Sequence, residues 1–118
     1  MNDLTKVLAG LILFVFALSS CEKIDLEKEA PGCVEGIIRE IKREPVRNPP
    51  ASVWEWKVDG KTYYYITSDC CDQFNFLYDD SCKVVCAPDG GLTGSGDGNC
   101  PELNAKVEKD LVWKDNRE

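Results

Sequence analysis

The sequence predicts a small α+β domain cross-linked by disulfides, in which one N-terminal amphipathic helix packs on a short antiparallel sheet beside a glycine-rich loop. Three observations predict this fold class. Residues 33–44 carry apolar side chains at helical spacing, residues 53–67 have the pattern of a β-hairpin, and six cysteines follow an export signal. A chain of 118 residues has room for one domain. We therefore expect a signal peptide at 1–20, an acidic tether at 21–31 and a single cysteine-rich domain at 32–116.

Residues 1–20 have the features of a secretory signal peptide. Val7–Leu18 is a continuous apolar run, shorter than the ~20 residues of a membrane-spanning helix. The run ends in Leu18-Ser19-Ser20-Cys21, which resembles the bacterial lipobox. This resemblance implies cleavage before Cys21 and acylation of its thiol, and Glu22 in place of an aspartate favours the outer membrane. The alternative is an ordinary signal peptide that leaves Cys21 unmodified.

The next segments are a tether, a helix and a connector. Acidic and basic residues alternate from Lys23 to Glu29, so we expect residues 21–31 to be a flexible tether. The helix is predicted at Cys33–Glu44, where apolar residues recur at i, i+3, i+4 and i+7: Val34, Ile37, Ile38 and Ile41. Three prolines then make Pro45–Pro50 an extended connector.

A β-hairpin follows the connector. Val53–Val58 and Lys61–Thr67 flank Asp59-Gly60, a pair preferred in type I′ turns. The two-residue loop pairs Val58 with Lys61 and places four aromatic residues on one face: Trp54, Trp56, Tyr63 and Tyr65. We expect the helix to pack on this face. The alternative is a ligand-binding patch that stacks on sugar rings or another flat ligand.

Shorter elements complete the sheet. Strands are expected at Phe76–Tyr78, at Lys83–Cys86 and, beside the hairpin, at Lys109–Lys114, with one helical turn at Pro101–Lys106.

The cysteines indicate disulfides. Six remain after Cys21, an even number typical of a small exported domain: Cys33, Cys70, Cys71, Cys82, Cys86 and Cys100. Neighbouring Cα atoms lie ~3.8 Å apart, below the ~4.4 Å of a usual bridge, so Cys70 and Cys71 are expected to take different partners. An extended Lys83–Val85 would keep Cys82 from bonding Cys86. A zinc site of four thiolates is the alternative, which export disfavours.

Residues 88–99 form a loop with five glycines between Gly90 and Gly98. The loop lacks the lysine of a phosphate-binding loop. Its side chains Asp89, Asp97 and Asn99 are hard oxygen ligands suited to calcium, although the EF-hand spacing is absent. The main expectation is a tightly turned structural or recognition loop without a cofactor, and the alternative is a calcium-stabilised recognition surface.

Charge and composition limit the functions that the sequence supports. The net charge of −7 opposes nucleic acid, and the absence of histidine removes the usual general base. We expect a non-enzymatic binding domain, held at the membrane by its N-terminal lipid, with an envelope protein or a glycan as partner. One alternative is a protease-inhibitor-like module with a rigid loop between disulfides. Another is a hydrolase that uses two carboxylates from this set: Asp69, Asp72, Asp79 and Asp80.

The chain also carries a set of short motifs: Asn48-Pro49-Pro50, Tyr64-Tyr65, Cys70-Cys71-Asp72, Tyr78-Asp79, Cys86-Ala87-Pro88-Asp89-Gly90-Gly91, Thr93-Gly94, Gly96-Asp97-Gly98 and Cys100-Pro101. Together they resemble a family of small cysteine-rich lipoproteins of Bacteroidota-type bacteria that has no assigned activity. The resemblance covers roughly Pro31–Arg117. It implies an outer-membrane lipoprotein, on the periplasmic face or the cell surface, and one fold unit, and it supplies no site residues.

Overall fold

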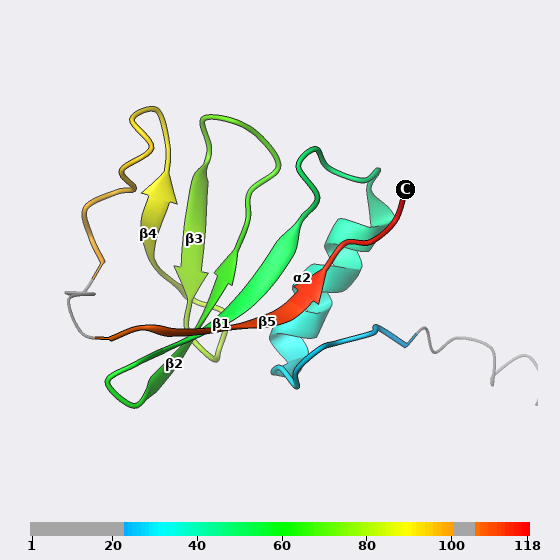
Figure 1. Cartoon of the computed structure of the whole chain (residues 1–118), viewed down its shortest axis with the longest axis horizontal. Coiled ribbons are helices and arrows are strands. Elements are labelled where there is room, and N and C mark those ends of the chain that lie inside the picture. Colours follow the sequence, from blue (N-terminus) through cyan, green and yellow to red (C-terminus); the bar gives the residue numbers. More distant parts are fainter. Residues whose placement is uncertain (1–22, 101–105) are drawn as a thin grey trace, which may run out of the picture.

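The computed structural model describes residues 23–100 and 106–118. The expected signal peptide, Cys21 and most of the helical turn expected at Pro101–Lys106 lie outside the described residues. The described chain contains one helix, α2 (Gly32–Arg43), and five strands: β1 (Ser52–Val58), β2 (Lys61–Ile66), β3 (Phe74–Tyr78), β4 (Val84–Gly90) and β5 (Glu108–Lys114). The strands form one antiparallel sheet in the order β4-β3-β2-β1-β5 (Figure 1). The predicted small α+β domain is confirmed.

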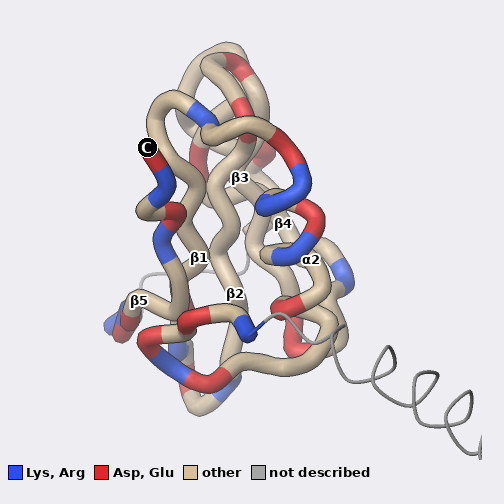
Figure 2. Tube along the Cα trace, turned by 90° about the vertical axis from the view of Figure 1, so that its right-hand side faces the viewer, with Lys and Arg blue, Asp and Glu red and all other residues tan. Residues whose placement is uncertain are grey.

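Helix α2 forms where the apolar spacing predicts it. Val34, Ile38 and Ile41 are buried on one side, while the charged residues Arg39, Glu40 and Arg43 are exposed. Figure 2 shows that charges of both signs occur along α2. The helix begins after Pro31, whose carbonyl accepts the backbone N–H groups of the first turn. Past its end, Arg117 donates to the backbone carbonyls of Ile41, Lys42 and Glu44. The C-terminal tail thereby satisfies carbonyls that a helix end leaves unpaired.

The hairpin has the predicted register, with Val58 opposite Lys61 and Trp56 opposite Tyr63. Asp59 and Gly60 both have positive φ, 49° and 77°, as a type I′ turn requires. The last strand pairs with β1 as expected, and β3 and β4 are longer than the sequence indicated.

The prediction that α2 packs on the aromatic face of the hairpin is wrong. The helix packs on the opposite face, where its side chains form a helix-side core with Val53, Tyr64, Ile66, Val112 and Trp113. The aromatic face forms a second core, in which Trp56 and Leu77 are buried beside Cys86. Both faces of the hairpin are apolar, because Val53 and Ile66 alternate with the aromatic residues. The alternation therefore could not show which face the helix would cover.

Residues 23–30 pack on the domain, which corrects the expectation of a free tether for this part of the segment. Exposed and partly buried residues alternate along it, and Ile24 and Leu26 contact the helix-side core. The backbone N–H of Glu27 donates to the Val112 carbonyl (2.8 Å). Lys28 Nζ lies 2.9 Å from Oε1 of the buried Glu55 and donates a hydrogen bond to Asp110 (3.0 Å). These two carboxylates raise the pKa of Lys28. We call this segment the N-terminal strap.

The six cysteines form three disulfides: Cys33–Cys82, Cys70–Cys71 and Cys86–Cys100. Cys82 and Cys86 do not bond each other, as expected. The expectation of different partners for Cys70 and Cys71 is wrong, since their Cα atoms are 3.7 Å apart and the sulfurs are bonded. The usual Cα separation describes bridges between distant segments, whereas neighbouring cysteines close an eight-membered ring. Because every one of these sulfurs is bonded to a second cysteine, the arrangement does not match a four-thiolate zinc site.

Candidate functional site

A single helix is too narrow to cover this sheet. Five strands ~4.8 Å apart span ~19 Å between the outer strands, whereas a helix with its side chains is ~10 Å across. Helix α2 packs on the start of β1 and the last residues of β2 and β5, and the N-terminal strap lies along β5. The flank of the sheet at β3 therefore keeps an open groove beside the helix.

This α2–β3 groove has a volume of about 490 Å³. Ile37 and Ile41 of α2 form one wall. The other wall is a ladder of three aromatic residues on β3, Phe74, Phe76 and Tyr78. Successive ring centroids of the ladder are 6.1 and 6.4 Å apart, and Phe74 keeps 38% of its surface exposed. Burial raises the pKa of the Tyr78 hydroxyl.

Charged residues stand at the Phe74 end of the groove. Arg47 Nη1 donates to the Thr67 carbonyl (3.1 Å), and Arg47 Nε lies 3.5 Å from Asp69 Oδ1. The Arg47 side chain is only 15% exposed, whereas that of Asp69 is 63% exposed. Asp72 is also exposed at this end. The charged groups that face solvent on this rim are therefore the carboxylates of Asp69 and Asp72.

The loop that carries this rim is held by hydrogen bonds. The Asn75 Oδ1 atom accepts the backbone N–H of Ser68 (2.8 Å), and Asn75 Nδ2 donates to Asp89 (2.8 Å). The Tyr65 hydroxyl donates to both Asp89 oxygens (2.8 and 3.0 Å). Burial and this bond to Asp89 raise the pKa of Tyr65. Hydrogen bonds among residues of β2, β3 and β4 thus hold the loop at this end of the groove in place without a bound partner.

The glycine-rich loop braces the same end and covers the edge of the sheet. Its Gly91 N–H donates to the Gln73 carbonyl (3.1 Å), and its Asp97 N–H donates to Ala87 of the edge strand β4 (3.0 Å). Gly96, at φ 77°, lies so close that a Cβ atom would overlap the Ala87 carbonyl oxygen. Covering an edge strand in this way limits its pairing with other chains. The expected turned loop is present, and Leu92, 87% exposed, projects from it.

The residues predicted to bind calcium have separate structural roles. The Asp89 carboxylate accepts from Tyr65 and Asn75, as described above. Asp97 Oδ1 accepts the Asn99 backbone N–H (2.9 Å), and this bond lowers the pKa of Asp97. Within residues 23–100 and 106–118, no group of three or more acidic or cysteine side chains is arranged to hold a metal ion.

The residues of the predicted aromatic patch mostly contact one another and the sheet. Trp56 stacks on Tyr65 with ring centroids 5.0 Å apart, and Lys109 Nζ lies 4.3 Å from the centre of the Trp56 ring. Trp54 Nε1 donates to Ser52 (3.1 Å). Trp54, Tyr63 and Tyr65 remain partly exposed around the buried Trp56.

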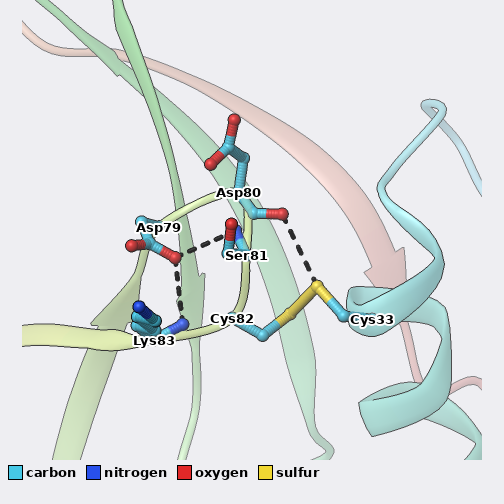
Figure 3. The surroundings of a disulfide bond; sticks show 6 residues. All are labelled: Cys33, Asp79, Asp80, Ser81, Cys82 and Lys83. Atoms are coloured by element: carbon cyan, nitrogen blue, oxygen red, sulfur yellow. Dashed lines mark hydrogen bonds between the residues drawn. A yellow bond between two sulfur atoms is a disulfide. The ribbon is translucent and has the colours of Figure 1, made fainter.

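The four candidate catalytic aspartates fall at opposite ends of β3. Asp69 and Asp72 precede the strand, while Asp79 and Asp80 follow it. Figure 3 shows Asp79 Oδ1 accepting the backbone N–H groups of Ser81 and Lys83, both at 2.9 Å, beside the Cys33–Cys82 disulfide. Asp79 therefore shapes the turn that this disulfide ties to α2.

Sequence reasoning missed the groove. The alternating aromatic residues Phe74, Phe76 and Tyr78 were a usable signal, since period-2 spacing puts them on one face of a strand. Arg47 gave no signal, because it lies in an irregular connector.

In the part of the chain that the structure describes, no helix is long and apolar enough to cross a membrane.

Comparison with known proteins gives one match. Residues 39–115 match a family described as a domain of unknown function, DUF6970. No curated protein and no solved structure matches the chain.

Proposed function

The chain belongs to the DUF6970 family, and on that premise we propose that it is a lipid-anchored, non-enzymatic binding domain of the cell envelope whose partner binds in the α2–β3 groove. The observation that carries the proposal is the groove: about 490 Å³ with aliphatic and aromatic walls. Ligand sites commonly have volumes of about 300–1,000 Å³ and mostly apolar walls with a few polar groups. The hydrogen-bonded rim supports the same conclusion, because a preformed site loses less entropy on binding.

Three disulfides in a small domain support a location outside the cytoplasm. The lipobox resemblance at Leu18–Cys21 supports a lipid anchor at Cys21, and Glu22 supports the outer membrane, at the periplasmic face or the cell surface. The partner in this setting is another envelope molecule.

The anchor is tested by replacing Cys21 with alanine in the full precursor. We expect the variant to lose incorporation of an alkyne-labelled fatty acid and to leave the membrane fraction. The Cys70→Ala/Cys71→Ala variant, which also loses cysteines, controls for thiol labelling and is expected to remain acylated. Unchanged acylation and fractionation of Cys21→Ala would contradict the anchor.

The groove is tested with the mature chain, kept soluble by Cys21→Ala and labelled with ¹⁵N. N-Acetylphenylalaninamide, a neutral aromatic probe, is expected to shift the amide signals of Ile37, Phe74 and Phe76. An Ile37→Trp variant, which fills the groove, is expected to lose these shifts. Glu40→Trp adds the same side chain on the exposed side of α2 and is expected to keep them. Shifts confined to other surfaces, or none at all, would refute the groove as a binding site.

A further inference from the structure

The walls and rim of the α2–β3 groove indicate what kind of partner it takes. We propose that the groove binds an extended, basic segment of a partner protein, with apolar side chains against the aromatic ladder and a lysine or arginine beside Asp69 and Asp72. This inference rests on the proposed function and adds the chemical class of the ligand.

The spacing of the ladder favours an extended peptide. Ring centroids along Phe74, Phe76 and Tyr78 are 6.1 and 6.4 Å apart. An extended chain repeats side chains on the same side every ~6.6 Å. In an extended segment of about five residues that lies along β3, three side chains therefore point into the groove, between the aromatic ladder and the aliphatic wall of α2.

The orientation of the rings argues against a glycan. Planes of Phe74 and Phe76 are inclined at 56°, and those of Phe76 and Tyr78 at 72°. Sugar rings stack on flat aromatic faces, and this ladder offers no common plane. Tilted rings with gaps between them suit individual side chains.

The charge of the rim selects a basic segment. The Arg47 side chain is only 15% exposed; its Nη1 donates to the Thr67 carbonyl, and its buried Nε, which has no hydrogen-bond partner among the described residues, lies 3.5 Å from Asp69. An approaching ligand therefore meets the exposed carboxylates of Asp69 and Asp72 first. The chain's net charge of −7 adds a general attraction for a basic partner. Both carboxylates precede Phe74, so the basic residue belongs at that end of the bound segment.

Two acetylated and amidated hexapeptides, whose first, third and fifth side chains share one side when extended, test the proposal: Lys-Gly-Phe-Gly-Leu-Gly and the same peptide with glutamine in place of lysine. Binding to the ¹⁵N-labelled mature chain carrying Cys21→Ala is followed by amide shifts at Phe74 and Phe76. Two exposed ion pairs predict a dissociation constant about tenfold lower for the lysine peptide at low salt. This preference is expected to shrink at high salt.

Variants locate the effect. Asp69→Asn/Asp72→Asn is expected to abolish the preference for lysine. Asp25→Asn/Asp80→Asn removes the same charge from exposed residues that do not line the groove and is expected to preserve the preference. Asp72→Asn alone, at a residue with no hydrogen bond among the described contacts, is expected to lose part of it without disturbing Arg47.

Each outcome decides between the two proposals. Equal binding of both peptides in the groove would overturn the basic-segment inference and leave the groove as an apolar binding site. If neither peptide binds while N-acetylphenylalaninamide does, the peptide class is overturned. If peptides and probe all fail to shift Phe74 and Phe76, the proposed function is overturned as well.

Discussion

Replacing Gly96 with alanine should detach the glycine-rich loop from strand β4. Gly94 and Gly96 have the same φ of 77°, but only Gly96 faces backbone that its new Cβ would overlap, whereas the space around Gly94 is open. Both substitutions carry the cost of left-handed backbone, about 1–2 kcal/mol. At Gly96 the loop must also lift from β4, which breaks the bonds Asp97 N–H to Ala87 (3.0 Å) and Gly96 N–H to Gly90 (3.1 Å).

Two lost hydrogen bonds add about 1–3 kcal/mol, so Gly96→Ala should be about 2 kcal/mol more destabilising than Gly94→Ala. The assay is urea unfolding of the oxidised protein, together with hydrogen exchange of the Asp97 amide. That amide should exchange faster in Gly96→Ala and remain protected in Gly94→Ala. Equal unfolding free energies, within about 0.5 kcal/mol, with the amide still protected in both variants, would refute the close approach.

Two further predictions concern the cross-links and the pH dependence of stability. The Cys33–Cys82 bridge spans 49 residues, and the Cys86–Cys100 bridge, which closes the glycine-rich loop, spans 14. Replacing both cysteines of a bridge with alanine should lower the free energy of unfolding in urea by about 4 kcal/mol for the first and about 3 kcal/mol for the second. The reverse order would contradict the idea that Cys33–Cys82 stabilises the fold by restricting the unfolded chain. The hydrogen bond from Arg117 lowers the pKa of the buried Asp115. The unfolded chain therefore binds this proton at a higher pH than the folded chain, so the stabilisation is complete above about pH 5 and is lost as the pH falls through the lowered pKa. Asp115→Asn should make the free energy of unfolding depend less on pH between about pH 5 and about pH 2, the range around and below the ordinary pKa of a carboxyl group. An unchanged slope in this range would show that another group is responsible.

Local chemistry was enough to predict the elements of the fold. The 3.6-residue spacing of Val34, Ile38 and Ile41 predicted α2, and Asp59-Gly60 predicted both the turn and the register of β1 and β2. These features depend on residues close together in the chain, whose preferences do not wait for tertiary contacts. The number of disulfides likewise followed from composition.

Long-range packing decided the rest. Both faces of the hairpin are apolar, and only the docking of α2 determined that Val53 and Ile66 would join the helix-side core. The strap had too few apolar residues to be distinguished from a tether, and its place depends on Val112 and Glu55, which are distant in sequence. The pairing of Cys70 with Cys71 depended on the path of the loop between β2 and β3.

The candidate site belongs to this second group. A groove exists because a single helix leaves the β3 side of a five-stranded sheet uncovered. This depends on the width of the helix compared with the width of the sheet, which no local sequence pattern shows. The sequence by itself determined where the helix and the five strands form, although β3 and β4 have other bounds than those predicted. The tertiary structure decided which apolar surface stayed open, because burial is a competition among all elements for a limited covering area.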